Sequence, residues 1–284
     1  VATWDLRTGL RLRTFSSHSD AVMGVAWGAR VWSVSEDGTA QAFNPAEQPS
    51  PPVRQLRHYD AVTAAAFFGE LLVTTSFDST LRTWDVAYGA SVQIRDDALG
   101  GLTDMAMSDD QRLLACASED GFARIYRLAE GWVPGLTLPT GEIHTVAFLT
   151  RHTLLTAGPD HPVQVWSLLD GSPLFALGAR EVSRCAVLRD GELLTADDAH
   201  PPVRWSGGEP VGSLGDAPAC ALATSGDTIA MGRATGVVEI WTDGDDSPGA
   251  LQKLHRGPVT ALALLPDGRV AVSYTHLTLP TIRE

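Results

Sequence analysis

The stretch Ala61–Arg95, AVTAAAFFGELLVTTSFDSTLRTWDVAYGASVQIR, contains four short apolar segments separated by turn residues. The segments are AVTAAAFF, LLVTTS, TLRTWDV and SVQIR, and Gly69-Glu70 and the FDS turn separate the first three. Runs of about four to eight residues that are rich in Val, Leu, Thr and aromatic side chains are typical of strands, and Gly, Asp and Ser between them indicate tight turns. The stretch therefore predicts four strands and no helix.

The same pattern recurs along the chain. The third segment of each unit ends in an aromatic residue, and successive aromatics are 39, 41, 42, 40, 39 and 36 residues apart: Trp4, Phe43, Trp84, Tyr126, Trp166, Trp205 and Trp241. Ten residues before the last six of these stand Ser33, Thr74, Cys116, Thr156, Thr195 and Met231. Six residues before them stand Asp37, Asp78, Asp120, Asp160, Ala199 and Thr235. This two-point register identifies one repeated unit.

Four strands at a period near 40 residues predict a propeller blade, because one such sheet buries both faces only when neighbouring blades stack against it. We expect an all-β propeller of four-stranded antiparallel blades. Six complete units have first strands beginning near Ala21, Ala61, Leu102, Ile143, Val182 and Ala219. Residues 1–15 supply only a third and fourth strand and residues 259–273 only a first and second. We therefore expect six complete blades plus a split seventh, which closes the ring if the chain ends meet.

Two dipeptides, Trp84-Asp85 and Trp4-Asp5, resemble the one after which the WD-repeat β-propellers are named, and the resemblance covers nearly the whole chain. In that family a His, a Ser or Thr, an Asp and a Trp form a buried hydrogen-bonded tetrad. The resemblance assigns a complete tetrad to His58, Thr74, Asp78 and Trp84. Partial tetrads are implied at His18, Ser33 and Asp37 (with Phe43), at Thr156, Asp160 and Trp166, at Asp120 (with Cys116 and Tyr126), at Thr195 and Trp205, and at His255, while Trp241 stands alone.

The tetrad is interpreted as a structural device, since a buried Asp needs hydrogen-bond donors. The alternative, a Ser/His/Asp-like catalytic group, is disfavoured because the trio repeats in degraded form along the chain. The sequence also contains no motif typical of phosphate, dinucleotide, zinc-protease or serine-hydrolase sites. A propeller hydrolase or lyase would instead need carboxylates or histidines converging on the central channel. We expect no catalytic activity and no cofactor.

Composition excludes further classes of function. Twenty-one basic residues against 34 acidic ones give a net charge of −13, which repels nucleic acid and anionic lipid. No run is long and apolar enough for a membrane span, and the first residues do not resemble an export signal. Cys116, Cys185 and Cys220 are far apart among apolar neighbours, which predicts buried thiols in a reducing cytoplasm. Lys253 is the only lysine, and this arginine bias points to a GC-rich, bacterial genome.

Two acidic clusters contain residue types that can bind metal ions. The first is formed by Asp243, Asp245 and Asp246, the second by Asp197, Asp198 and His200. Both are interpreted as polar turns. The first lacks the distal glutamate of a calcium loop, and the second directly precedes Pro201-Pro202. We expect no metal ion.

The resemblance implies that the loop before each first strand and the turn between the second and third strands share a face that docks partner proteins. That candidate partner face would carry Tyr59, Phe77, Glu36, Asp104, Glu119, His161 and His200. We therefore expect a monomeric interaction scaffold for proteins or peptides with basic patches. The alternative is a sensory or recruiting C-terminal module of a larger bacterial signalling enzyme (a kinase, nucleoside triphosphatase or protease) whose catalytic domain lies outside this fragment.

The end of the sequence departs from the repeat. Residues 272–281, VSYTHLTLPT, agree with the translation of a transposase adapter used in sequencing libraries. We therefore expect the propeller to occupy residues 1–271, and residues 272–284 to be a non-native tail of a fragmentary gene product.

Overall fold

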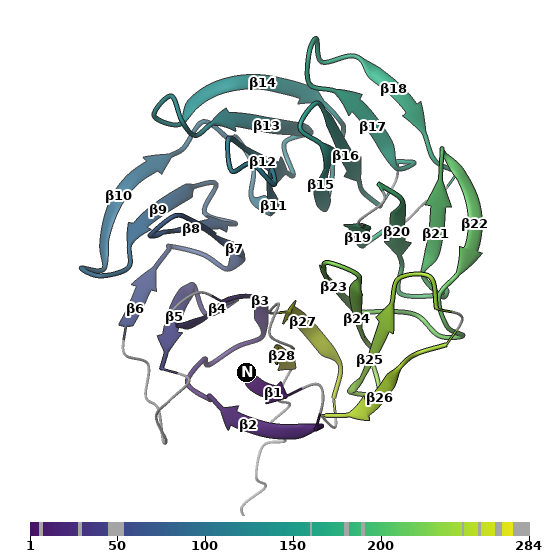
Figure 1. Ribbon diagram of the computed structural model, residues 1–284. Helices are drawn as coiled ribbons and strands as arrows, with labels where there is room; N and C mark the ends of the chain where they lie inside the picture. The colour runs from purple at the N-terminus through teal and green to yellow at the C-terminus, as the bar shows by residue number, and fades with distance from the viewer. Residues whose placement is uncertain are drawn as a thin grey trace, which may run out of the picture.

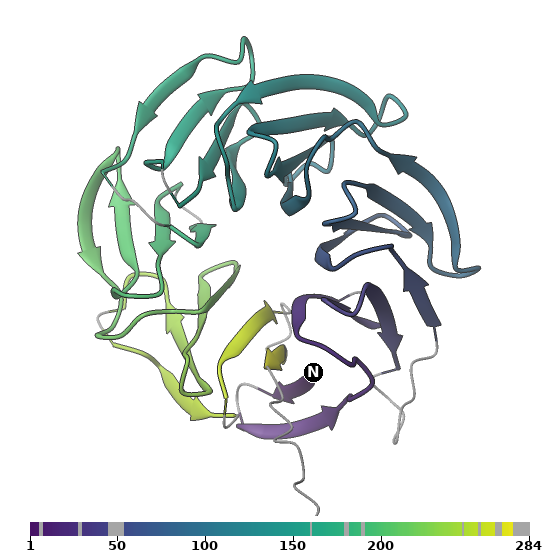
Figure 2. The same ribbon diagram turned by 180° about the vertical axis from the view of Figure 1, so that it is seen from behind.

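Seven β-propeller blades form a ring (Figures 1 and 2), and residues of their innermost strands line a central channel. The computed structural model describes residues 1–5, 8–27, 30–44, 54–159, 161–178, 182–188, 191–245, 247–254, 257–264 and 269–274. Every regular element within these ranges is a strand, and each blade is a four-stranded antiparallel sheet. None of the described residues belongs to a helix of the length and apolar character that a bilayer span requires.

Six blades follow the chain in order, each from its innermost to its outermost strand. The first three are β3 (Val22–Trp27), β4 (Val31–Ser35), β5 (Thr39–Phe43) and β6 (Arg54–Arg57); β7 (Val62–Phe68), β8 (Leu71–Ser76), β9 (Leu81–Asp85) and β10 (Ala90–Arg95); and β11 (Leu102–Met107), β12 (Leu113–Ser118), β13 (Phe122–Arg127) and β14 (Val133–Pro139). The next three are β15 (Thr145–Thr150), β16 (Thr153–Ala157), β17 (Gln164–Ser167) and β18 (Pro173–Ala176); β19 (Arg184–Val187), β20 (Leu193–Ala196), β21 (Val203–Ser206) and β22 (Glu209–Ser213); and β23 (Ala221–Ser225), β24 (Thr228–Gly232), β25 (Val237–Thr242) and β26 (Ala250–Lys253).

The seventh blade joins both ends of the described chain. Its strands are β1 (Ala2–Asp5), β2 (Leu10–Thr14), β27 (Val259–Leu264) and β28 (Arg269–Tyr274), in the order β2-β1-β28-β27. In the β1–β28 pair, Ala2 lies opposite Val272 and Asp5 opposite Arg269. The expectation of six blades plus a split seventh is thus corrected to seven complete blades, because antiparallel pairing satisfies the free edges of both end segments.

The last strand extends past the boundary expected after Ala271, and the adapter origin of residues 272–284 stays a prediction. Strand β28 continues to Tyr274, and Val272 is fully buried in an apolar cluster shared with the blade β23–β26. The alternation of Val270 and Val272 explains this, since residues two apart on a strand face the same side. The rest of the expected tail, residues 275–284, lies outside the described residues.

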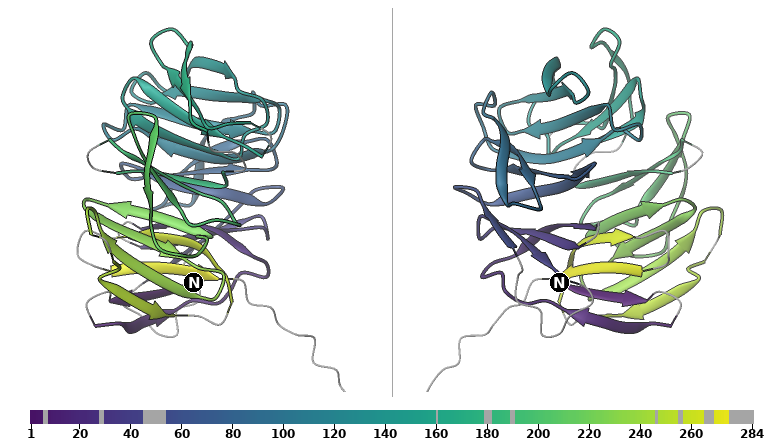
Figure 3. Two further views of the ribbon diagram at one scale, coloured as in Figure 1. Left: turned by 90° about the vertical axis from the view of Figure 1, so that its right-hand side faces the viewer. Right: turned by 60° about the vertical axis from the view of Figure 1, so that its left-hand side comes forward.

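The apolar core lies between adjacent blades. Trp32 and Val34 of one blade, for example, share a cluster with Leu72 and Trp84 of the next. In side view the strands run across the thickness of the ring (Figure 3), so the connecting loops gather on its two faces. The fold therefore presents two loop faces, an outer rim and a channel as surfaces on which a site could form.

Candidate functional site

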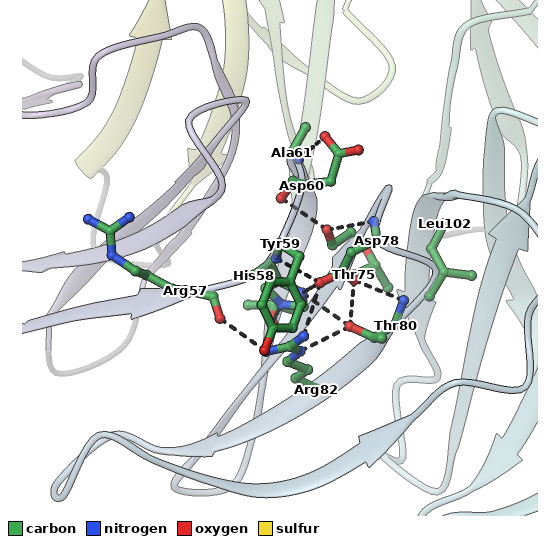
Figure 4. Close-up of polar contacts among 12 residues, drawn as sticks. Arg57, His58, Tyr59, Asp60, Ala61, Thr75, Asp78, Thr80, Arg82 and Leu102 are labelled. Atoms are coloured by element: carbon green, nitrogen blue, oxygen red, sulfur yellow. Dashed lines mark hydrogen bonds and ion pairs between the residues drawn. The ribbon is translucent and has the colours of Figure 1, made fainter.

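The complete tetrad connects the loop before β7 with strands β8 and β9, and Figure 4 labels two of its members, His58 and Asp78. His58 Nδ1 lies 3.0 Å from Asp78 Oδ2, and His58 Nε2 lies 2.7 Å from Thr74 Oγ1. The indole N–H of Trp84 donates to the same threonine oxygen at 2.8 Å. The four side chains thus form one continuous chain of hydrogen bonds from a turn to the third strand.

Two further side chains belong to this network and were not foreseen from the sequence. The hydroxyl of Thr80 donates to Asp78, and the guanidinium of Arg82 lies 3.1 Å from the same carboxylate (Figure 4). Burial alone would raise the pKa of Asp78, but the hydrogen bonds from His58 and Thr80 hold it well below its usual range. A signal was present, because Arg82 is two residues from Trp84 on one strand and shares its face.

The tetrad has no access for a substrate. The side chains of His58 and Asp78 are only 1% and 5% exposed, and burial lowers the pKa of His58. Within the described residues nothing indicates catalysis by this cluster, and its contacts are those of a structural network that fastens a loop to two strands.

The blade β3–β6 keeps three of the four groups. His18 Nδ1 lies 2.8 Å from Asp37 Oδ2, and its Nε2 lies 2.8 Å from Ser33 Oγ. Phe43 cannot donate a hydrogen bond and stacks on Phe15 instead, with ring centroids 4.8 Å apart. Burial would raise the pKa of Asp37, yet hydrogen bonds from His18 and neighbouring groups lower it to about 2.

In two other blades the described residues include the Trp–Thr pair of the tetrad. Trp166 donates to Thr156 at 2.9 Å and Trp205 to Thr195 at 2.8 Å. Asp160 and His255, which the resemblance placed in tetrads, lie outside the described residues.

The remaining tetrad candidates form hydrogen bonds with residues outside the tetrad positions. Trp241, expected to stand alone, donates to Glu239 at 3.2 Å, and Glu239 also pairs with Arg233. This acceptor lies outside the tetrad positions, and it satisfies the buried indole N–H, which would be costly without one. Asp120 accepts from Arg124 at 2.7 Å and lacks a histidine partner. Tyr126 donates to Asp97 at 2.7 Å, and Cys116 is buried beside it.

The candidate partner face is assembled by a repeated backbone contact. Glu36, Phe77 and Glu119 occupy equivalent turn positions in three consecutive blades, and the backbone N–H of each donates to a carbonyl just before the first strand of its own blade, at 2.9, 2.9 and 3.0 Å. The loop before the first strand and the turn between the second and third strands are therefore side by side, as expected.

The two predicted aromatic residues of this face differ in exposure. Tyr59 is 93% exposed, and the guanidinium carbon of Arg82 lies 5.2 Å from its ring centroid (Figure 4). Phe77 is 37% exposed and rests on Gly101 of the next blade, where an added Cβ would lie 2.4 Å from its ring. Tyr59 is thus an exposed surface residue that contacts Arg82, while Phe77 is partly a packing residue.

Leu99 was missed in the sequence analysis. It is 92% exposed, and its backbone N–H donates to Asp120 at 2.8 Å as that of Tyr59 donates to Asp78 at 3.0 Å. Its position in the repeat, next to the tetrad-histidine position, was the signal that could have found it. We use the name loop face for the surface formed by Glu36, Tyr59, Phe77, Leu99 and Glu119.

Asp104 does not belong to the loop face, which corrects the sequence interpretation. It lies in the innermost strand β11, where its carboxylate accepts from Thr145 Oγ1 at 2.9 Å and from the backbone N–H of Val146 at 3.1 Å. Burial raises its pKa to about 6. The reason is register: β11 starts at Leu102, so Asp104 is already inside the sheet, where it links two blades.

The two candidate histidines are both exposed but have local contacts. His161 lies against Gly141, and His200 lies 3.1 Å from the Asp197 carboxylate in its own turn. The backbone N–H groups of Ala199 and His200 also donate to Asp197, which explains this cluster as a hydrogen-bonded turn.

The acidic cluster near Asp243 is also engaged in protein contacts. Asp243 pairs with Arg204 at 2.8 Å, while Asp246 lies outside the described residues. In the part of the chain that the structure describes, no three His, Cys, Asp or Glu side chains are grouped as metal ligands.

Comparison with known proteins places two of the repeats in a family. Residues 50–85 and 94–127 match the profile described as "WD domain, G-beta repeat". Together with the seven four-stranded blades, this match supports a WD-repeat β-propeller. A computationally designed protein, Ika8, has the same fold with a TM-score of 0.74 and 23% identity, over 96% of this chain and 89% of that one.

Several curated relatives are similar over part of their length. The nuclear distribution protein PAC1 of Arthroderma otae is 28% identical over 144 residues, covering 45% of this chain and 31% of that protein. Mitochondrial division protein 1 of Pyricularia oryzae is 27% identical over 196 residues (47% and 30%), and telomerase protein component 1 of Mus musculus is 25% identical over 228 residues (76% and 9%). The chain spans less than a third of the length of these relatives.

Proposed function

We propose that this propeller is a non-catalytic docking platform that binds proteins or peptides on its loop face. The observation that carries the proposal is the exposure of Tyr59 and Leu99, two large side chains on adjacent blades that are 93% and 92% exposed. Apolar and aromatic residues that gather on one face without a packing role mark interaction surfaces. The WD-repeat match supports the same role, since such propellers generally bind protein partners.

The environment of Tyr59 suits an interface anchor. Its ring is held over Arg82, whose guanidinium is itself fixed by the Asp78 carboxylate at 3.1 Å. A side chain that is already ordered loses little conformational entropy on binding, and a tyrosine contributes a large contact area. A partner would therefore meet a preorganised aromatic side chain.

The charge of the loop face favours a basic partner. Glu36 and Glu119 are exposed turn residues of the blades on either side of the blade β7–β10. The chain as a whole carries a net charge of −13. Complementary charge accelerates encounter and selects against acidic competitors. We propose peptides that combine an apolar residue with lysine or arginine.

A peptide library displayed on phage and selected on the wild-type protein tests the proposal. Selected peptides should be basic and should bind Y59A/L99A at least tenfold more weakly than wild type. The matched control is Y88A/L169A, which removes an exposed tyrosine and leucine from turns between third and fourth strands. Equal binding to wild type and Y59A/L99A, or an equal loss with the control, would overturn the loop-face assignment.

The role of the whole protein is likewise a proposal, because the chain spans less than a third of its curated relatives. We propose that the propeller recruits partners for the whole protein, either as a cytoplasmic scaffold or as a module beside an enzyme domain. The peptide selection addresses the propeller in both cases, since the loop face is formed by blades that the structure describes.

A further inference from the structure

The blade β15–β18 lacks the tetrad histidine. The backbone N–H of Thr140 donates to Gly121 O at 3.0 Å, just as that of His58 donates to Gly38 O at 2.9 Å. Each accepting glycine directly follows the turn aspartate of the preceding blade. Thr140 therefore occupies the backbone position that the histidine occupies in the blade β7–β10.

Thr140 does not replace the imidazole. Its hydroxyl donates locally to Gly141 O at 3.0 Å. A cavity of about 320 Å³ lies beside it, with Thr156, Trp166, Gln164 and His161 in its walls. The blade β7–β10 therefore serves as an internal template, because it shows how a histidine ring is bound at the equivalent position.

Without a histidine ring in this blade, the Thr156 hydroxyl lacks the partner that His58 provides for Thr74. This side chain is 2% exposed and accepts the indole N–H of Trp166 at 2.9 Å. In the template blade the equivalent Thr74 accepts from Trp84 in the same way and is also bonded to His58 Nε2 at 2.7 Å. Within the described ranges, no side chain or backbone group accepts the hydroxyl proton of Thr156, so a buried donor lines the cavity.

Among the described wall residues, Gln164 and His161 make their contacts elsewhere. The amide nitrogen of Gln164 donates to Val165 O at 3.0 Å and Phe175 O at 2.8 Å, toward the outer strand β18. The equivalent Arg82 of the template blade instead contacts Asp78. On the other side, the ring of His161 lies against Gly141, where an added Cβ would be 2.4 Å from Nε2.

We propose that this cavity is a binding site for a small planar azole, whose acceptor nitrogen takes the hydroxyl proton of Thr156 as His58 Nε2 bonds Thr74 in the template blade. The ring would pack edge to face with Trp166, as His58 does with Trp84 at a centroid distance of 5.8 Å. The volume lies in the range of small-ligand sites. This site is separate from the loop face and does not depend on the docking function.

Imidazole is the first probe, with pyrrole as its control. Pyrrole has the same ring size but no acceptor nitrogen, so it cannot receive the proton of Thr156. At about pH 8.5 imidazole is largely neutral. The melting temperature of the wild-type protein should rise saturably with imidazole and not with pyrrole. No response to imidazole, or an equal response to pyrrole, would overturn the assignment.

Two variants locate the site. T156V removes the donor and should weaken imidazole binding at least tenfold, while T195V removes the equivalent hydroxyl bonded to Trp205 in the next blade and should leave binding unchanged. T140H should restore the tetrad ring, raise the melting temperature without ligand and abolish the response to imidazole. Imidazole binding that survives T140H, or that T156V and T195V affect equally, would place the ligand elsewhere.

Discussion

His58 and Trp84 bond the same oxygen atom, the hydroxyl of Thr74, at 2.7 and 2.8 Å, and their rings meet edge to face. His58→Ala would remove the imidazole that bonds both the Thr74 hydroxyl and the Asp78 carboxylate. It would also leave a cavity where the ring was. We expect it to lower the free energy of unfolding by about 2–4 kcal/mol. Urea denaturation followed by tryptophan fluorescence measures this loss.

The control for this prediction is His200→Ala. His200 is exposed and bonds only within its own turn, so its removal should change the free energy of unfolding by less than about 0.5 kcal/mol. Equal effects of the two substitutions would show that the tetrad does not stabilise the fold.

The repeat spacing predicted the fold and the tetrad because both depend on local geometry. Thr74 and Trp84 are ten residues apart on paired strands, and Leu72 lies opposite Trp84, so Thr74 is two residues further along the same face. A hairpin with a fixed turn length therefore brings the hydroxyl and the indole together wherever the ten-residue spacing recurs.

What the sequence did not predict depends on contacts between blades and on side-chain direction. Asp104 is placed by the register of β11 and by donors from the next blade, Thr145 and Val146, about 40 residues away. Likewise, Trp241 found a partner in Glu239, a residue type outside the expected tetrad. Neither contact follows from the repeat, because the residues involved break it.

Tyr59 and Phe77 should differ in their effect on stability. Tyr59→Ala should change the free energy of unfolding by less than about 0.5 kcal/mol, since the side chain is almost fully exposed. Phe77→Ala should cost about 1 kcal/mol, because the ring packs on Gly101 of the next blade. Thermal unfolding of both variants and of the double variant measures these effects.

If the double variant loses stability but still binds the peptides selected on the loop face, both aromatics are packing residues. Unchanged stability together with weaker binding would instead assign both to the interface. The expected result lies between these, with Phe77 alone responsible for the change in stability.

The cysteines should be protected from alkylation in the folded protein. Burial raises the pKa of Cys116 far above its usual range and that of Cys185 to about 12, so neither forms much thiolate at pH 8. Iodoacetamide followed by peptide mass spectrometry should label Cys220 first, since it is less buried. Urea should make all three react at similar rates. Rapid labelling of Cys116 without denaturant would contradict its place in the core.

Asp104 should make the protein less stable as the pH rises. Its pKa is about 6 in the fold and close to 3.9 in the unfolded chain, so the folded state binds more protons between about pH 4 and 6. The free energy of unfolding should therefore fall across this window by about 3 kcal/mol through this group. Asp104→Asn cannot ionise and should remove that fall.

Asp37 provides the control of opposite sign. Its pKa is lowered to about 2, so its contribution to stability is present above about pH 4 and is lost as the pH falls toward 2. Asp37→Asn should destabilise the protein relative to wild type near pH 7 and have little effect near pH 2. Asp104→Asn should change stability relative to wild type more favourably near pH 8 than near pH 4. Urea denaturation at these pH values distinguishes the two. Equal pH profiles for wild type and Asp104→Asn would mean that this carboxylate is solvated rather than held between blades.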